Sequence, residues 1–405
     1  MRLLHTSDWH LGKRLFDKER YDVFEKFLAW LLNTIHTQRV DTLIVAGDIF
    51  DTAVPTNKSL RLYYDFLSQL TSSECRHVII VSGNHDSPTL LEAPKEILAS
   101  LGVHVIGSAE NPENEVIELK DVSGNLEGVV CAVPFLRERD ILRLKDDSLL
   151  SRSEEIKLAV EKHYNSVVKT AIDRMGARRV PLVATGHLFT LGSPKGEDIN
   201  ELYIGSTGAV PVDIFSPEID YLALGHIHRA YCIAGDKTRN YCGAPIPFTF
   251  EEANLAKFVR LVDFEAEGIN VTDIQVPQFD RLVSVHGTQH EISAKLKELI
   301  EQDEEILVEV IHTGAIDVIN LTGEVAEQTS GTKIEVLRVF DETKKANCLA
   351  NDVDEMEIGE LTWENVFEKK LKNETLDGEV SEEELWNAYR NAYFQISELA
   401  DVNAQ

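Results

Sequence analysis

Residues 42–51, TLIVAGDIFD, hold the pattern that decides the fold of this chain. An apolar run typical of a buried strand ends in a glycine and an aspartate, Asp48. Polar blocks follow similar runs in four further stretches: RLLHTSDWH (2–10), HVIIVSGNHD (77–86), PLVATGH (181–187) and YLALGHIH (221–228). An α/β sheet presents polar side chains together at the carboxyl ends of its strands. Five such blocks therefore predict one site assembled from distant segments.

The composition is that of a globular protein with more than one domain. Apolar residues make up 43% and charged residues 27% of the 405 residues, and this length predicts two or three domains. We find no apolar run near the roughly 20 residues of a membrane span, and no signal-peptide layout at the start. We therefore expect a cytoplasmic protein with no membrane partner. The five scattered cysteines predict neither disulfides nor a thiolate metal site.

The net charge of −29 weakens a nucleic-acid interpretation without excluding it. Residues 341–405 contain 17 acidic and 6 basic residues and so carry −11 of this charge. Bound divalent cations would offset several carboxylates in the rest of the chain. A partner subunit could also supply the basic surface that a nucleic acid needs.

Residues 1–110 alternate strand-like and helix-like segments, which predicts βαβ units that feed one sheet. The expected helices of the first domain, residues 1–275, lie near residues 19–37, 58–72, 89–100 and 154–175. RNYCGAPIPFTF (239–250) and AKFVRLVDFEA (256–266) read as further strands that cover one face.

Residues 280–341 repeat a strand–helix rhythm without polar blocks, so we expect a small α+β capping domain that shapes the substrate. Its helices are expected near residues 291–302 and 315–328. An acidic linker at 342–360 precedes two predicted helices within 361–400, which carry apolar stripes. Stripes at helical spacing usually pack on the chain's own core, but aromatic residues are also frequent at partner interfaces.

The residues of the five blocks are candidate metal ligands. Oxygen and nitrogen donors without thiolate suit Mn²⁺, Fe²⁺ or Zn²⁺. Seven donors exceed what one catalytic ion needs and fit two neighbouring ions, which activate water for displacement at phosphorus. The candidate donors are Asp8, His10, Asp48, Asn84, His187, His226 and His228.

Taken in order, the blocks resemble the signature of the calcineurin-like metallophosphoesterases. PFLRERDI (134–141), YIG (203–205) and YCGAPIPFTFEE (241–252) make the chain similar, more narrowly, to the SbcD family of bacterial nuclease subunits. The resemblance implies an α/β fold: a sandwich of mixed sheets flanked by helices, a small α+β capping domain and a C-terminal helix pair. It also implies a 3′→5′ exonuclease on duplex DNA and an endonuclease on single strands and hairpins, for end processing in replication and recombination.

The same resemblance implies the cofactors and the partners. Two divalent ions, taken to be Mn²⁺, would be bound, one by Asp8, His10, Asp48 and His228 and the other by Asp48, Asn84, His187 and His226. The helix pair would bind an SbcC-type coiled-coil ATPase, and two copies of the chain would form a homodimer through the helices near residues 57–70 and 89–100.

Two catalytic residues are expected beside the metals. By the resemblance His85 is the imidazole that protonates the leaving oxygen or stabilises its charge. Asp86 is a candidate to orient that imidazole, with a structural loop carboxylate as the alternative. Asp51 occupies a position where archaeal relatives carry a histidine, so we interpret it as a residue behind the ligands or a structural group.

The substrate stays open from the residues alone. Lys13, Arg14, Arg137, Arg139 and Arg229 could contact backbone phosphates, but ordinary surface charge is as good an explanation for each. A phosphoesterase acting on a small nucleotide or a phosphoprotein fits the metal motif equally well. A non-catalytic adaptor is a third hypothesis, against which the complete ligand set argues.

Overall fold

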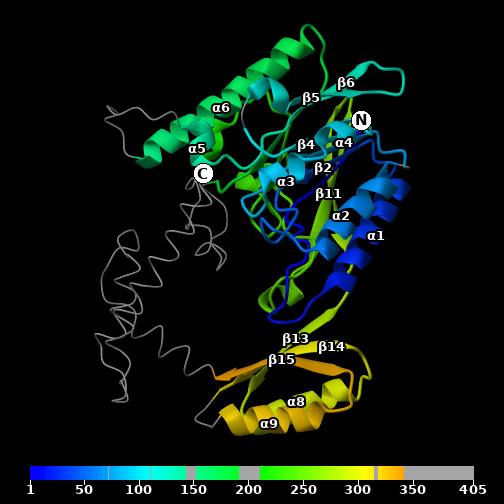
Figure 1. The fold of residues 1–405 in the computed structure, drawn as a ribbon, viewed down its shortest axis with the longest axis vertical. Coiled ribbons are helices and arrows are strands. Elements are labelled where there is room, and N and C mark those ends of the chain that lie inside the picture. The colour runs from blue at the N-terminus through cyan, green and yellow to red at the C-terminus, as the bar shows by residue number, and fades with distance from the viewer. Residues whose placement is uncertain (72, 110, 143–151, 191–209, 314–317, 342–405) are drawn as a thin grey trace. The chain divides into compact units, whose positions relative to one another are not determined.

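The first of three sheets in this computed structural model has the strand order β12-β11-β1-β2-β3-β4 (Figure 1). The structure describes residues 1–341 except 72, 110, 143–151, 191–209 and 314–317. Strands β1 to β4 run parallel, and β11 and β12 are antiparallel additions at one edge. The bounds are β1 Arg2–Thr6, β2 Thr42–Ala46, β3 His77–Val81, β4 Val103–Ile106, β11 Lys257–Glu265 and β12 Gly268–Val276.

The second sheet has the order β5-β6-β7-β8-β10-β9. Strands β6, β7, β8 and β10 are parallel, whereas β5 and β9 pair antiparallel with their neighbours. The bounds are β5 Val116–Lys120, β6 Leu126–Cys131, β7 Leu182–His187, β8 Tyr221–Gly225, β9 Tyr231–Cys232 and β10 Arg239–Tyr241.

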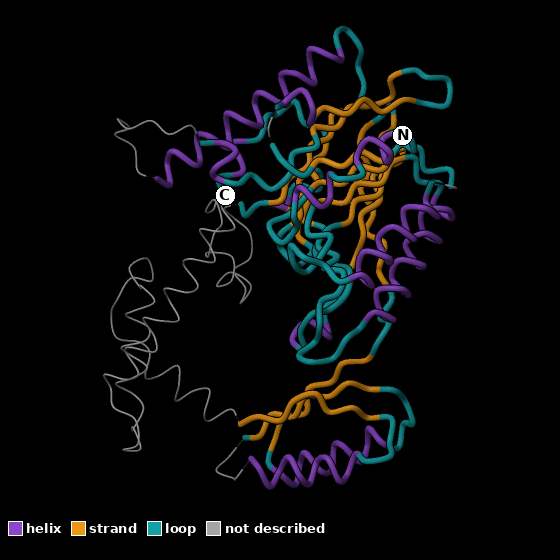
Figure 2. The backbone as a smooth tube through the Cα atoms, in the orientation of Figure 1, coloured by secondary structure: helices purple, strands orange, loops and turns teal. Residues whose placement is uncertain are grey.

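The two large sheets pack face to face and helices cover their outer faces (Figure 2). Ile44 and Ile79 of the first sheet share a buried core with Val130 and Val183 of the second. Helices α1 (Tyr21–Gln38) and α2 (Asn57–Leu70) cover the first sheet, and α6 (Arg152–Met175) covers the second. This is the predicted sandwich of mixed sheets flanked by helices, so the fold-class prediction is confirmed.

The structure corrects two local predictions. The helix expected near 89–100 is two short helices, α3 (Pro88–Glu92) and α4 (Lys95–Ala99), because Pro94 has no amide hydrogen to continue a helix. The strand expected over 239–250 ends at Tyr241. Gly243 then adopts a φ of +79°, and two prolines keep the following residues out of the sheet.

A third sheet, β13-β14-β15, forms a smaller layer with its own core. Its strands are β13 Arg281–Gly287, β14 Ile306–His312 and β15 Ile334–Asp341, and its helices are α8 Gln289–Ile300 and α9 Val318–Thr329. Leu282 of this sheet shares a small apolar cluster with Leu15 and Phe250. Short elements elsewhere are α5 Glu138–Ile141 and the 3₁₀ turns Pro112–Glu115, Val212–Ile214, Ile233–Gly235 and Glu251–Asn254.

By its contacts the chain divides into two units, residues 1–340 and 341–405. The predicted acidic linker at 342–360 and helix pair within 361–400 lie outside the described residues. The predicted domain boundaries therefore stay predictions. Within the described part, we find no helix with the length and apolar character to cross a membrane.

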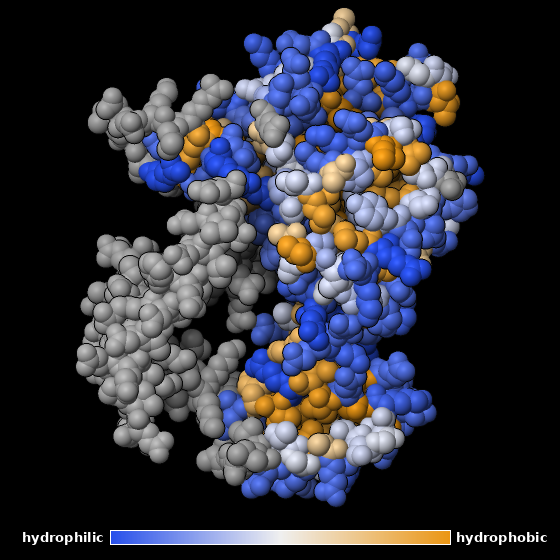
Figure 3. Space-filling model, in the orientation of Figure 1, coloured by the Kyte–Doolittle hydropathy of each residue, from blue (hydrophilic) through white to orange (hydrophobic). Residues whose placement is uncertain are grey.

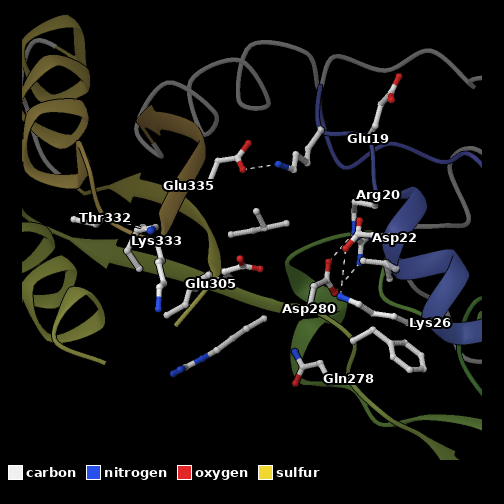
Figure 4. A pocket seen from close by; sticks show the side chains of 17 residues that line it. Glu19, Arg20, Asp22, Lys26, Gln278, Asp280, Glu305, Thr332, Lys333 and Glu335 are labelled. Atoms are coloured by element: carbon white, nitrogen blue, oxygen red, sulfur yellow. Dashed lines mark hydrogen bonds and ion pairs between the residues drawn. The ribbon is translucent and has the colours of Figure 1, made fainter. Parts of the chain in front are cut away.

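A cavity of about 850 Å³ lies where the start of α1 meets β13, β14 and β15 (Figure 4). Its lining is strongly charged, and two ion pairs connect its walls, Arg20 with Asp280 and Lys18 with Glu335. Its lining, drawn from the described residues, includes none of the candidate site residues. The candidate chemistry must therefore be sought at the strand ends.

Candidate metal centre

The candidate site residues lie at the carboxyl ends of strands from both large sheets. Asp8 and His10 follow β1, Asp48 follows β2, and the block 83–86 follows β3. His187 ends β7, and His226 and His228 follow β8. Because β1 to β3 belong to the first sheet and β7 and β8 to the second, the site lies at the seam between the two layers.

The backbone turns sharply at these strand ends. Asp8, His10, Asp48 and His226 have φ values of 52°, 45°, 50° and 95°, a region that non-glycine residues seldom adopt. Such strain persists where the surroundings fix a side chain for function. Gly83 is required for a different reason, because a Cβ there would lie 2.0 Å from Asp48 Oδ1.

A first group of donor atoms comes from Asp8, His10 and His228, whose ligand atoms all lie within 4.8 Å of one another. The Nε2 atoms of His10 and His228 are 3.1 Å apart, and Asp48 Oδ2 lies 3.5 Å from His10 Nε2. Carboxylate oxygens and imidazole nitrogens thus converge on one point, which fits a divalent cation.

A second group lies on the other side of Asp48. The Oδ2 atom of Asp48 is 3.1 Å from His187 Nε2, and His226 belongs to the same group of potential ligands. Asn84 Oδ1 lies 3.1 Å from His187 Nε2 and 3.0 Å from His226 Nδ1. Asp48 Oδ2 therefore faces both donor groups, and both would share it if two ions were bound.

Neighbouring groups orient these donors. His187 Nδ1 lies 2.9 Å from the Ala46 carbonyl oxygen, and a proton donated there leaves Nε2 free to bind a cation. Asp8 accepts hydrogen bonds from the Ser7 hydroxyl at 2.5 Å and from the His226 backbone N–H at 2.8 Å. The donor set is therefore held in place by contacts that span both sheets.

Burial and mutual contact shift the pKa values of the donors in different directions. Burial lowers the pKa of His226 to about 3 and that of His228 well below its usual value, so both imidazoles are neutral and can bind a metal. Burial would raise the pKa of Asp48, but His187 holds it well below its usual range. Against burial, Asp48 raises the pKa of His187 to about 9, so cation binding would displace a proton from His187.

His85 lies beside the donor groups. Its Nδ1 atom is 2.8 Å from the Asp51 carbonyl oxygen, and its backbone N–H donates to Asp48 Oδ1 at 3.0 Å. The half-buried ring packs edge-on against His10. With Nδ1–H donating to the carbonyl, Nε2 is the nitrogen left to face a substrate.

The contacts of Asp86 differ from those that the sequence interpretation expects. The sequence prediction has it orient His85, but the Asp51 carbonyl occupies that place. The buried Asp86 carboxylate instead accepts hydrogen bonds from the backbone N–H groups of Ile49, Phe50 and Gly83. It therefore joins the loop after β2 to the loop after β3, which is the structural alternative that the sequence leaves open.

Asp51 lies behind the first donor group. Its Oδ1 atom is 3.6 Å from His10 Nδ1 and 3.1 Å from Lys13 Nζ. Burial would raise the pKa of Asp51, but contact with His10 and Lys13 lowers it to about 2. A carboxylate facing the second nitrogen of a candidate ligand is a common way of orienting it.

The other basic residues lie differently around the site. Arg14 donates to the Asp17 carbonyl on the surface, Arg139 pairs with Asp140, and Arg229 is exposed. Arg137 instead turns inward onto the loop after β3. Phe248 follows β10, which ends at Tyr241, and packs edge-on against His10 and His228. This contact was not predicted from the sequence.

Comparisons with known proteins identify the family of this chain. Residues 1–230 match the family model described as calcineurin-like phosphoesterase. The chain is 34% identical to the SbcD subunit of the SbcCD nuclease from Escherichia coli (strain K12), over 93% of this chain and 94% of that protein. It is 28% identical to the same protein of Bacillus subtilis (strain 168), over 95% and 96%, and 35% identical to that of Rhodobacter capsulatus, over 69% and 70%. The enzyme class is that of hydrolases of phosphoester bonds, and the chain belongs to the SbcD family within the calcineurin-like phosphoesterases.

Proposed function

We propose that the chain is the catalytic subunit of a cytoplasmic two-metal DNA nuclease. The observation that carries this proposal is the pair of donor groups that share Asp48 Oδ2. Asp8, His10, Asp48 and His228 would hold one ion, and Asp48, Asn84, His187 and His226 the other. Two such ions, proposed to be Mn²⁺, supply an activated water and stabilise charge on the phosphate oxygens.

The chain's own residues provide the rest of the chemistry. His85, held through Nδ1 by the Asp51 carbonyl, would carry a proton on Nε2 and give it to the leaving 3′ or 5′ oxygen. Its backbone N–H fixes Asp48 at the same time. These two contacts support the proposal by holding His85 beside Asp48.

The proposed substrate is duplex, single-stranded and hairpin DNA, cut by 3′→5′ exonuclease and endonuclease action. Support comes from the relatives, which are named as subunits of a nuclease complex. The complex name also supports a partner, proposed to be an SbcC-type coiled-coil ATPase. The net charge of −29 supports the view that a partner supplies part of the DNA-binding surface.

A homodimer is proposed through the face formed by α2, α3 and α4. Val54, Ile97 and Leu101, on or beside these helices, expose 87%, 71% and 52% of their surface. Apolar patches are visible over these helices in the space-filling view (Figure 3). Clustered exposed apolar residues of this kind mark protein interfaces.

The decisive experiment compares substrates and one histidine variant. The wild-type chain in Mn²⁺ is given labelled duplex and hairpin DNA, bis-p-nitrophenyl phosphate and cyclic nucleotides, with and without the partner ATPase and ATP. Release of nucleotides from duplex 3′ ends is expected. Preference for a small phosphoester over DNA would instead support the small-molecule alternative.

His85→Ala is expected to lower kcat by at least about 100-fold while two Mn²⁺ ions remain bound. His36→Ala, a change of an exposed histidine on α1, is the matched control and should act like wild type. Unchanged DNA cleavage by His85→Ala would remove His85 from the mechanism, and a wild-type chain that binds no metal would overturn the proposed function.

A further inference from the structure

The segment after β6 crosses from the second sheet to the first and meets the loop that carries Asn84 and His85. The backbone N–H of Phe135 donates to the Ser82 carbonyl at 2.8 Å, directly after β3. This bond joins the two layers beside the candidate metal centre. The residues that follow it therefore lie against donors from both sheets.

Arg137 contacts both ends of the loop 83–86. Its Nη2 atom lies 3.0 Å from the Asp86 carbonyl oxygen and 3.4 Å from that of Gly83. The two carbonyls flank Asn84 and His85 in the chain. The guanidinium group thus binds the carbonyl oxygens of this loop. The Asp86 carboxylate accepts hydrogen bonds from three backbone N–H groups, one of them in the same loop.

Phe135 extends the same contact to the second sheet. Its buried ring lies 6.3 Å from the ring of His187 and 6.5 Å from that of His226, measured between centroids. The guanidinium carbon of Arg137 lies 5.5 Å from the Phe135 ring centroid, within the range of a cation–π contact. Arg137 and Phe135 therefore connect the Asn84 loop with two histidines of the opposite sheet.

We propose that Arg137, supported by Phe135, is a positioning residue that fixes the loop 83–86 against His187 and His226. It would thereby set the geometry of the second metal position and of His85. This inference rests on the proposed two-metal function. It also reassigns Arg137, which the sequence offered as a contact to DNA phosphate.

A hydrogen-bonding argument supports positioning over substrate binding. The two N–H groups of Nη2 lie in the plane of the guanidinium, so this one nitrogen can donate to both fixed carbonyl oxygens. The Nη1 atom of Arg137 is buried and has no hydrogen-bond partner among the described residues. Nη1 is shielded from solvent and Nη2 already contacts two carbonyl oxygens, which favours a role in holding the loop over one in binding phosphate.

The experiment makes three measurements on each variant. Mn²⁺ binding is measured by calorimetry, stability by the melting temperature, and activity by kcat and KM on bis-p-nitrophenyl phosphate and duplex DNA. Arg137→Gln is expected to lower the affinity for the second Mn²⁺ ion by about 10- to 100-fold. We also expect a drop in kcat of at least tenfold on both substrates and a change in KM of less than threefold. Arg137→Lys should recover part of the loss, since an ammonium keeps the charge but lacks the planar group that lies over the Phe135 ring.

Arg174→Gln is the matched control. Arg174, on α6, also donates to two backbone carbonyls, those of Glu113 and Val116. It should leave metal binding and kcat unchanged. Should Arg137→Gln fail to fold, Arg137→Lys and Phe135→Leu are judged by the same metal-binding criterion.

Two results would overturn the inference. One is a raised KM with normal kcat and normal Mn²⁺ binding, which would make Arg137 a substrate contact. The other is Mn²⁺ binding and kcat that match the Arg174→Gln control. Failure of the wild-type chain to bind two Mn²⁺ ions would overturn the proposed function instead, so the two failures are distinguishable.

Discussion

Replacing Asp86 tests whether this carboxylate builds the site or takes part in its chemistry. The carboxylate is 2% exposed and accepts hydrogen bonds from Gly83, Phe50 and Ile49 at 2.8, 3.0 and 3.1 Å. Asp86→Ala leaves three buried N–H groups without this acceptor. At about 1–3 kcal/mol for each unsatisfied buried group, the loss could reach several kcal/mol.

An opposing effect lowers this figure. Burial and the nearby Asp48 carboxylate raise the pKa of Asp86 to about 6, so ionised Asp86 carries a penalty at neutral pH that alanine removes. We therefore expect Asp86→Ala to lower the free energy of unfolding by about 3–5 kcal/mol. Asp86→Asn keeps one oxygen that can accept two of the three bonds, and should cost about 1–3 kcal/mol.

The assay is urea unfolding in EDTA, followed by fluorescence, because the fully buried Trp9 gives a signal from this core and metal binding is then excluded. A loss below about 1 kcal/mol for Asp86→Ala would refute the structural role. A second result would refute it differently: Asp86→Asn with normal stability and metal content, but with the kcat loss of His85→Ala. That outcome would restore Asp86 as the partner of the His85 imidazole.

Three further predictions concern metal, the cavity and the dimer face. EDTA should lower the melting temperature, since each ion present at 100 times its Kd stabilises by about 2.7 kcal/mol; an unchanged melting curve would contradict the metal centre. Arg20→Met should cost about 3–5 kcal/mol in urea unfolding, because Arg20 is 2% exposed and pairs with Asp280 at 2.8 and 3.0 Å; a loss below about 1 kcal/mol would show that the pair contributes little. Ile97→Glu should convert a dimer to monomer in sedimentation without changing kcat on bis-p-nitrophenyl phosphate, whereas an unchanged sedimentation coefficient would place the interface elsewhere.

The sequence was sufficient to predict the sandwich and to propose the donor residues for a local reason. Each proposed donor stands at or shortly after the end of an apolar strand, and at several of these ends the close approach of backbones requires glycine. A Cβ on Gly225, for example, would lie 1.9 Å from the Ala46 carbonyl oxygen. Strand ends marked in this way are readable without knowledge of the three-dimensional contacts.

Predictions failed where local competition or distant contacts decide the structure. The segment 239–250 has the apolar content of a strand, but Gly243 and two prolines remove it from the sheet after Tyr241. Adjacency in the chain suggests that Asp86 pairs with His85, yet the Asp86 carboxylate accepts hydrogen bonds from three backbone N–H groups. The Asp51 carbonyl orients His85 instead, and a backbone oxygen leaves no mark on residue type.

The location of the site between two sheets explains why the contacts that position the donors are the hardest part of the site to predict from sequence. Asn84 comes from the first sheet and His187 and His226 from the second, so no single strand sets the distance between these donors. That distance depends on contacts that cross the seam, such as the Phe135 N–H to Ser82 carbonyl bond. These contacts use backbone atoms and ring faces, which many sequences could provide. A metal ligand, by contrast, must be one of a few residue types. Candidate ligands can therefore be proposed from sequence, whereas the separation of the two donor groups must be obtained from the packing of the two layers.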